Sequence, residues 1–485
     1  MKKFGCGFKF SLILIAILII GGFYVWQAVK NFNLQKVLES NFIQTQVSRQ
    51  IGDKAPELLS VLPKFLGFSR PMTYLILFQN NTEIRPGGGF IGSYAVVKMD
   101  KGKTELIAVD GSENLDKNIP ADFKMTPPKP LKEFLGVDRW YFRDANWSPD
   151  FAVSAQKALD LYTGERGVEA ENIDVVVGMT PTVLEEFLRD LGSLTVNGVD
   201  FDADNVTEKL EYEVEYAYDE KGLEFHERKD ILKPFMLELL SQLKVYSLIN
   251  LQDYYDIMHQ MIEEKQLVLY SPEVDLQSEL NEMGWSGQVE DTNNDFLLWV
   301  DANLGALKTD HAIKRDLTYT FDYDKESNRY LARATMNYKH SGSFDWRTSR
   351  YRSYVRVFVP LGSELKSVQG SMKNDKSDEP YSVDQGQDLK KTWFGAFISI
   401  EPGRDATLVF EYYLPVDLSS KIKNGLYDLL VQKQLGTKEV SLTLDLNFAK
   451  NIYTAQPEED RSDWADNVYS YTTPLYTDRE FVVRF

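Results

Sequence analysis

The hydrophobic residues follow a different pattern in each of four stretches of the chain. Residues 11–29 are almost uniformly apolar and include no formally charged side chain. Residues 31–70 place apolar side chains every three or four positions, which is the spacing of an amphipathic helix. Strand-like and helix-like patterns alternate over residues 71–308, and strand-like patterns follow one another over residues 309–485. The chain is therefore predicted to contain one transmembrane helix, a helical stalk, a layered domain of α/β or α+β class and a C-terminal all-β sandwich.

The apolar run from Ser11 to Val29 is long enough to cross a bilayer. An α-helix rises about 1.5 Å per residue, and the hydrocarbon core is roughly 30 Å thick. Tyr24 and Trp26 lie at its far end, where aromatic rings favour the headgroup region. The alternative is a cleaved signal peptide with its site at Gly21-Gly22, but the run ends in bulky side chains rather than a small-x-small motif. We therefore expect this segment to anchor the protein in the lipid bilayer.

The charges that flank this run predict its orientation. Lys2, Lys3 and Lys9 precede it, and Lys30 and Lys36 follow it. A basic N-terminal flank favours a cytoplasmic N-terminus, and long C-terminal domains are translocated largely regardless of charge. We therefore expect a single-pass protein of the cell membrane. Residues 1–30 form its cytoplasmic tail and signal anchor, and the bulk of the chain is extracytoplasmic, in the cell envelope.

Residues 71–308 carry the pattern of a layered domain. Its first strands, at 74–79, 90–99 and 104–109, are separated by turn residues and are predicted to form an antiparallel meander. A helix is predicted over 181–191, with Thr180 as its N-cap and Gly192 as its stop. The remaining predicted elements are helices at 148–162, 206–212, 225–243 and 251–264 and strands at 173–179, 194–196, 267–270 and 296–300.

Residues 309–485 carry the pattern of consecutive β-strands. Several of these strands alternate between apolar and polar positions, and turn residues separate many of them. Such regular spacing is typical of an Ig-like β-sandwich. The predicted strands are 317–323, 330–338, 351–359, 393–400, 407–414, 440–446, 467–471 and 479–485.

The charge of the chain limits its classes of partner. The formal net charge is −19 at pH 7. Phosphate binding requires clustered cations, so we expect no nucleic-acid partner. Acidity keeps a protein soluble and is compatible with neutral or cationic glycopolymers. The one cysteine, Cys6, lies before the membrane span, so no intramolecular disulfide can form, which is ordinary for a bacterial envelope protein.

Motifs of common hydrolases and metal sites do not occur in the sequence. The four histidines, His226, His259, His311 and His340, are scattered, and none has the spacing of H-E-x-x-H. The chain has no G-x-S-x-G nucleophile elbow and no cysteine beyond Cys6. We therefore assign no catalytic residue and no metal ligand, and we expect no cofactor.

Gly87, Gly88 and Gly89 open a G-x-G-x-x-G cluster that follows a predicted strand. A dinucleotide fingerprint would continue into a helix, whereas the next residues here are strand formers, so we do not expect a nucleotide site. One interpretation is a flexible loop whose glycines adopt positive φ. The other is a loop of backbone N–H groups that cradles an anion beside Arg85.

A second polar cluster precedes the predicted helix at 148–162. It contains Asp144, Asn146 and Asp150 together with Arg143. The N-terminus of a helix attracts anions, and Arg143 would add to this attraction. The alternative is a loop that caps and docks the helix. Asp144, Asn146 and Asp150 therefore join Arg85 and the three glycines as a candidate anion or ligand site.

The residues now described carry a resemblance to a known family. Residues 79–94, QNNTEIRPGGGFIGSY, resemble the signature of a bacterial domain-of-unknown-function family, number four thousand and twelve in its series. Residues 144–151, DANWSPDF, are similar to its second motif, and residues 173–177 with 184–192 are similar to its third. The resemblance covers about residues 71–308. It implies a membrane-anchored, extracytoplasmic protein of uncharacterised activity.

The third motif also resembles, more distantly, the LytR-CpsA-Psr family. Members of that family transfer glycopolymers from a lipid pyrophosphate carrier to the cell wall with the help of Mg²⁺. Glu227-Arg228-Lys229, ahead of a predicted long helix, is similar to the Arg-rich helix start of that family, so Arg228 joins the candidate site. The Arg-Ser-Asp-Thr and Pro-Arg-Asp motifs of that family have no clear match here.

Two functions are compatible with the sequence. The first is an envelope protein that binds a cell-wall or surface glycopolymer or a neighbouring envelope protein. The second is a Mg²⁺-dependent glycopolymer phosphotransferase, in which Arg85 and Arg228 neutralise a pyrophosphate and carboxylates such as Asp110, Asp144 or Asp150 hold the metal. The enzyme requires these side chains to converge on one pocket beside an apolar groove for a lipid chain.

Overall fold

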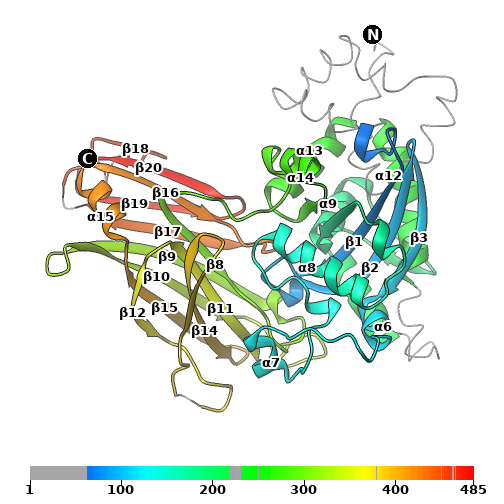
Figure 1. The fold of residues 1–485 in the computed structure, drawn as a ribbon, viewed down its shortest axis with the longest axis horizontal. Helices are drawn as coiled ribbons and strands as arrows, with labels where there is room; N and C mark the ends of the chain where they lie inside the picture. The colour runs from blue at the N-terminus through cyan, green and yellow to red at the C-terminus, as the bar shows by residue number, and fades with distance from the viewer. Residues whose placement is uncertain are drawn as a thin grey trace, which may run out of the picture.

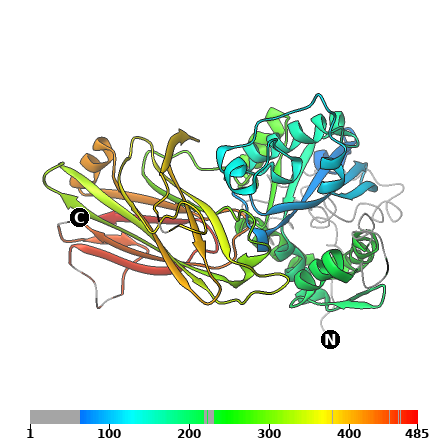
Figure 2. The same ribbon diagram turned by 90° about the horizontal axis from the view of Figure 1, so that it is seen from below.

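An α/β part and a β-rich part lie side by side (Figures 1 and 2). The structure, a computed structural model, describes residues 63–485 except 218–221, 223–230, 250, 378, 449, 461, 463 and 465. The predicted membrane span, Cys6 and all of the predicted stalk before residue 63 lie outside the described residues. Among the residues that are described, no helix combines the length and the apolar character needed to cross a membrane.

A five-stranded sheet forms the centre of the α/β part. Its strand order is β3-β2-β1-β4-β7. β1 pairs antiparallel with β2, and β2 with β3, which confirms the predicted meander, whereas β1 and β4 are parallel. The strands are β1 (Met72–Asn80), β2 (Phe90–Asp100), β3 (Lys103–Gly111), β4 (Val175–Met179) and β7 (Leu267–Tyr270).

Helices cover both faces of this sheet, because its central strands are apolar on both sides. Alternate residues of β1 show the two faces: Tyr74 and Ile76 belong to one core, and Leu75 and Leu77 belong to the other. α8 (Phe151–Gly164) packs on the second face. The first face is covered by α9 (Pro181–Leu191), α12 (Leu232–Ile249), α13 (Leu251–Glu263) and α14 (Val274–Glu282).

Local sequence signals explain where α8 and α9 begin and end. α9 has the predicted bounds, with Pro181 at its first position and Gly192, at φ +85°, after its end. Thr180 is its N-cap residue, but the Thr180 hydroxyl donates to Gln266 Oε1 (2.6 Å) instead of capping the helix. α8 is capped by Asp150, whose side chain accepts from Val153 N at 3.1 Å.

The α/β part contains several shorter elements. The Pro-rich stretch after β3, where no helix or strand is predicted from the sequence, contains a helix, α7 (Lys129–Leu135). The other short elements are α6 (Ser112–Lys117), α10 (Val206–Tyr212), β5 (Leu194–Val196), β6 (Val199–Phe201), the 3-10 helices η3 (Asn81–Glu83), η4 (Phe142–Asp144), η5 (Ala170–Asn172) and η8 (Thr309–Ala312), and the π-helix η6 (Glu213–Ala217).

The β-rich part consists of two sheets that share one hydrophobic core. Their orders are β12-β15-β10-β9-β17-β19 and β13-β14-β11-β8-β16-β20-β18, with parallel pairs β9–β17 and β8–β16. β8 (Asp295–Val300) lies in the middle of the second sheet, so the β-rich part includes a strand from before residue 309. The remaining elements are β9 (Ile313–Asp324), β10 (Arg329–His340), β11 (Tyr351–Pro360), β12 (Glu364–Gln369), β13 (Asp384–Asp388), β14 (Lys391–Ile400), β15 (Asp405–Tyr413), α15 (Val416–Lys423), β16 (Leu426–Gln432), β17 (Val440–Asn447), β18 (Thr454–Gln456), β19 (Val468–Pro474) and β20 (Arg479–Arg484).

The loop between β16 and β17 joins the two parts of the molecule. Leu435 pairs with Gly87 in a parallel bridge and is buried in the core on the α8 face. Gln434 Nε2 donates to the carbonyl oxygens of Arg85 (3.1 Å) and Asp301 (2.8 Å). Gly436 O accepts from Asn81 Nδ2 at 3.0 Å. The signature segment after β1 is therefore part of the contact between the α/β part and the β-rich part.

Candidate functional site

Arg85 is enclosed by protein groups from both parts. Its guanidinium forms ion pairs with Glu83 (3.1 Å) and Asp144 (3.2 Å) and donates to Asn303 O. The Arg85 side chain is 3 % exposed. Structure and prediction agree that Arg85 and Asp144 lie together. However, the charge of Arg85 is compensated by two carboxylates, so an incoming anion would have to displace an internal partner.

The glycine cluster is packed rather than open. Gly87 N donates to Asn146 O (3.0 Å), and Gly88 N donates to Arg85 O (3.1 Å). A Cβ atom at Gly88 would lie 2.3 Å from Gln79 Oε1, and one at Gly89 would lie 2.5 Å from the backbone of Asn80. These glycines are needed for close approach of the surrounding groups.

The second polar cluster also serves packing. Asn146 Nδ2 donates to Gly89 O at 2.5 Å, which connects the two motifs. Asp150 accepts from Val153 N (3.1 Å) and from Val289 N (2.9 Å), and burial raises the pKa of its carboxyl group. The structure thus brings Arg85, the glycines, Asp144 and Asn146 together as an internal junction. Arg228, the last predicted site residue, lies outside the described residues.

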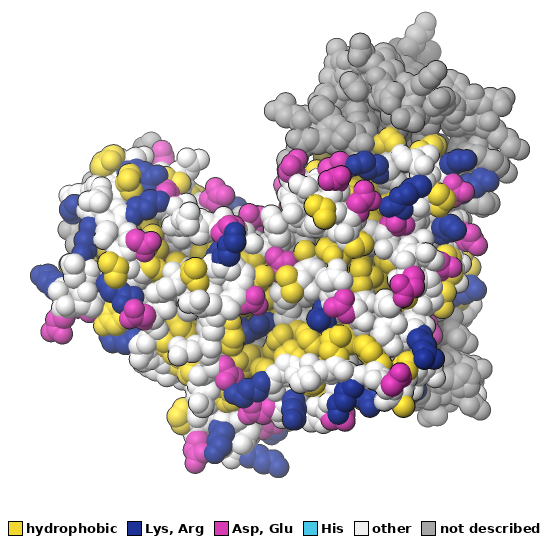
Figure 3. Space-filling view, in the orientation of Figure 1, with side chains coloured by type: hydrophobic (Ala, Val, Ile, Leu, Met, Phe, Trp, Pro, Cys, Tyr) yellow, Lys and Arg dark blue, Asp and Glu magenta, His cyan; other side chains and the backbone are white. Residues whose placement is uncertain are grey.

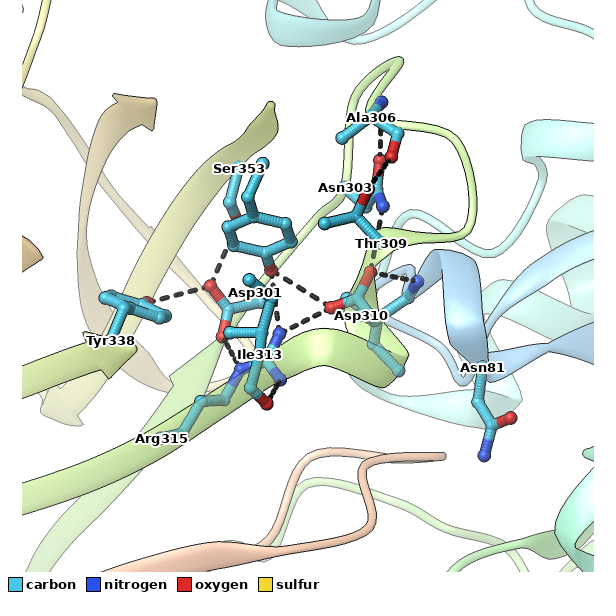
Figure 4. A network of polar contacts seen from close by, with 12 residues as sticks. Asn81, Asp301, Asn303, Ala306, Thr309, Asp310, Ile313, Arg315, Tyr338 and Ser353 are labelled. Carbon is cyan, nitrogen blue, oxygen red and sulfur yellow. Dashed lines mark hydrogen bonds and ion pairs between the residues drawn. The ribbon is translucent and has the colours of Figure 1, made fainter. Parts of the chain in front are cut away.

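A buried polar network extends this junction into the β-rich part (Figure 4). Arg315 lies between two carboxylates and donates to Asp301 Oδ2 (2.9 Å) and Asp310 Oδ1 (2.5 Å). Asp310 also accepts from Ile84 N (3.1 Å), in the signature segment, and from Asn303 Nδ2 (2.8 Å). Tyr338 OH donates to Asp301 Oδ1 at 2.8 Å. The network holds the two parts against each other, and its polar groups satisfy one another.

A large apolar groove lies in the α/β part, between the first face of the sheet and the helices that cover it. Its volume is about 440 Å³. The sheet contributes the apolar side chains of Phe78, Phe90, Val109 and Met179, and it also contributes Gly92, in β2. A Cβ atom added at Gly92 would meet no heavy atom within 4 Å, so the groove is open beside this residue. The helices contribute Val183, Leu184, Phe187, Leu210, Leu232, Phe235, Met236 and Leu239.

Charged residues line the same groove. Its lining includes more carboxylates than cations. The carboxylates are Glu83, Glu113, Glu211 and Glu215, and the cations are Arg143 and Lys308. Each cation has an acidic partner within the protein: Arg143 pairs with Asp116 (2.9 Å) and Lys308 with Glu215 (3.5 Å). The groove therefore combines an apolar wall with acidic groups.

Asp116 and Glu165 form a buried acidic pair behind Arg143. Phe142 N donates to both Asp116 Oδ1 and Glu165 Oε1, at 3.1 Å each. Burial, together with the neighbouring Asp116 carboxylate, raises the pKa of Glu165 to about 8. Burial also raises the pKa of Asp116, to about 6, against the opposing charge of Arg143. Glu165 is therefore mostly protonated at neutral pH.

No group of three or more His, Cys, Asp or Glu side chains within the described ranges is arranged to hold a metal ion. Of the carboxylates named above as metal ligands of the phosphotransferase alternative, Asp144 pairs with Arg85 and Asp150 caps α8. Asp110 accepts from Asn114 Nδ2 at 2.7 Å.

Sequence reasoning missed the groove as a site. Most of its apolar wall comes from β1, β2, β3, β4, α9, α10 and α12, and each of these segments carries an ordinary amphipathic or apolar pattern. One signal was available: Gly92 and Ser93 interrupt the apolar run of β2 at the position where the groove opens.

The fold and the site together define a protein of two parts. An α/β layer with an apolar groove is joined by buried polar contacts to a pair of β-sheets. Residues 69–215 match the family described as "Protein of unknown function (DUF4012)". The matched range includes all three signature motifs and confirms their resemblance to this family over residues 69–215. None of the curated proteins matches the chain.

Solved structures give only weak similarity. A protein of Legionella pneumophila, for which nutrient binding has been suggested, shares 8 % identity, with 39 % of this chain and 71 % of that chain covered and a TM-score of 0.23. An M1 zinc metallopeptidase of Deinococcus radiodurans shares 12 %, covering 36 % of this chain and 42 % of its own, with a TM-score of 0.17. Leukotriene A4 hydrolase of Saccharomyces cerevisiae shares 10 %, covering 36 % and 29 %, with a TM-score of 0.22. This chain spans less than half of either of these two enzymes, and no function is carried over from any of the three.

Proposed function

We propose that this protein is a membrane-anchored, extracytoplasmic envelope protein that binds the apolar chain of an envelope amphiphile. The observation that carries the proposal is the apolar groove of about 440 Å³ between the sheet and α9, α10 and α12. This volume lies within the range of about 300–1,000 Å³ that is usual for ligand pockets.

The lining of the groove supports an apolar ligand. Its walls are aliphatic and aromatic, and removal of a hydrocarbon chain from water stabilises a complex by roughly 0.8 kcal/mol for each buried CH₂ group. The groove also lies beside Asn80 and Met179, at the carboxyl ends of the parallel strands β1 and β4. Open α/β sheets commonly bind ligands at this end of their parallel strands.

The position of Arg85 favours binding over phosphotransfer. The enzyme alternative requires Arg85 to neutralise a pyrophosphate, but Arg85 is 3 % exposed and already paired with Glu83 and Asp144. Displacing these internal carboxylates would leave buried charges unpaired, which is costly. We therefore propose a binding role and assign no catalytic residue.

Gly92→Trp tests the proposal, because the new side chain enters the groove without a clash at its Cβ atom. We expect the wild-type ectodomain to bind N-phenyl-1-naphthylamine, an uncharged apolar fluorophore, and decyl glucoside to displace it. Gly92→Trp should weaken this binding about tenfold or more, because the indole occupies the space of several methylene groups.

Lys98→Trp is the matched control, since Lys98 is exposed on the same strand, β2. It should bind the fluorophore as the wild type does, and both variants should keep the wild-type thermal midpoint within a few degrees. Failure of the wild type to bind any apolar probe would refute the proposal. Unchanged binding by Gly92→Trp would show that the probe binds elsewhere.

A further inference from the structure

The charges around the apolar groove are strongly unequal. Four carboxylates and two cations line it, and both cations are paired with acidic groups of the protein. On the face of the molecule that Figure 3 draws, by contrast, acidic and basic side chains are interspersed. The excess of negative charge at the groove is therefore a local feature of this site as well as a consequence of the net charge of the chain.

Three of the four carboxylates lie at the same end of the groove. Glu83 is the last residue of η3, Glu211 lies in the last turn of α10, and Glu215 lies in the adjoining π-helix η6. Glu83 Oε1 accepts from Arg85 Nη2, and the Glu83 side chain is 17 % exposed. Glu211 Oε1 accepts from Asn80 Nδ2 and Thr82 Oγ1, and Glu211 Oε2 forms an ion pair with Arg347 Nε (2.6 Å). Glu215 is 34 % exposed beside Lys308.

The cations near this end of the groove do not make its electrostatic potential positive. Arg85 is shared between Glu83 and Asp144, so its single charge faces two carboxylates. Arg347 lies 2.6 Å from Glu211 and 3.5 Å from Glu208, so it too faces two. Lys308 faces one, Glu215. A ligand head placed here therefore meets a negative potential beside a low-dielectric apolar wall, where charges interact more strongly than in water.

We propose that the groove selects single-chain amphiphiles with a positively charged head. The chain lies along the apolar wall, and the head lies against Glu83, Glu211 and Glu215. This inference rests on the proposed function and adds the class of ligand to it. A phosphate or carboxylate head would meet like charges, and the two groove-lining cations already have internal partners.

The test compares three ligands with the same decyl chain, each below its micellar concentration: decyltrimethylammonium, decyl glucoside and decyl sulfate. Each displaces N-phenyl-1-naphthylamine from the ectodomain. At low ionic strength we expect the cation to bind about tenfold or more tightly than the anion, with the uncharged glucoside between them. In 0.5 M NaCl the ratio should fall to about threefold or less, because salt screens the carboxylates that remain accessible.

Glu215→Gln should reduce the ratio of cation to anion affinity by about threefold or more, because it removes a groove carboxylate and leaves Lys308 without this partner. Glu282→Gln is the matched control: it changes the net charge equally, but Glu282 is exposed on α14 and does not line the groove. It should keep the wild-type ratio. Anions that bind as tightly as cations at low salt would overturn the inference while leaving the proposed function intact. Absence of binding by all three ligands would refute both.

Discussion

At the scale of single residues, Glu165 has the most unusual environment. It caps the end of α8, is 2 % exposed, and shares Phe142 N with Asp116. Burial and the adjacent carboxylate both disfavour its charged form, and together they raise its pKa from 4.5 to about 8. The folded protein therefore binds a proton at this site over a pH range in which the unfolded chain releases it.

This proton makes stability depend on pH. Its stabilising effect is fully present below about pH 4.5 and is lost as pH rises through the folded pKa of about 8. The thermal midpoint of the wild type should therefore fall between pH 5 and pH 9. Glu165→Gln keeps an acceptor for Phe142 N and supplies an uncharged donor toward Asp116, so it should reduce this fall and be about 1–2 kcal/mol more stable than the wild type at pH 9.

Glu171→Gln controls for the loss of one carboxylate, since Glu171 is exposed in η5. It should follow the wild-type pH profile. If Glu165→Gln also followed that profile, the carboxyl group of Glu165 would not be the group that titrates.

At the scale of elements, the loop between β16 and β17 depends on Gly436. Its φ is +75°, and a Cβ atom there would lie 2.1 Å from Gly88 O. Gly436→Ala should cost about 2–4 kcal/mol, because the new methyl group is both strained and placed against backbone that cannot move alone. Thermal or urea unfolding measures this loss.

Gly403→Ala separates backbone strain from the clash. Gly403 has a similar φ, +72°, but a Cβ atom there would meet nothing within 4 Å. This variant should lose only about 1 kcal/mol. Equal losses for the two variants would mean that contact between Gly436 and Gly88 contributes nothing to stability.

Elements with strong local signals were predictable from the sequence. α9 was predicted with its observed bounds because Pro181 and Gly192 mark its ends. β8 was predicted as a strand but assigned to the α/β part, because an apolar strand carries no signal for the sheet it joins. α7 was missed, and it is held by tertiary contacts such as Phe134 on Phe397, whose ring centroids lie 4.1 Å apart.

The candidate site shows the same limit. The sequence motifs correctly indicated that Arg85 and Asp144 lie close together. They could not indicate that Asn303 and Gln434, both more than 200 positions away, also bind the Arg85 segment and close it. The groove likewise depends on elements from β1 to α12 that meet only in the folded chain.

At the scale of the whole molecule, the two parts are expected to unfold together. Arg315 connects them: its side chain, 7 % exposed, pairs with Asp301 and Asp310, and Asp310 in turn accepts from Ile84 N. Arg315→Met would leave two buried carboxylates without a cation, which should cost about 3–5 kcal/mol. Calorimetry should show one unfolding transition for the wild type and two for this variant, because the link between the parts is weakened.

Arg333→Met is the control, since Arg333 is 53 % exposed and pairs with Glu411 on the surface of β10 and β15. It should lose less than about 1 kcal/mol and keep a single transition.

Asp310→Asn, added to Arg315→Met, should recover part of the lost stability. It removes one unpaired buried charge, while the amide oxygen of the new side chain can still accept from Ile84 N. Arg315→Met could instead show a single transition, with a midpoint lowered no more than that of Arg333→Met. This result would mean that the β16–β17 loop, and not Arg315, couples the unfolding of the two parts.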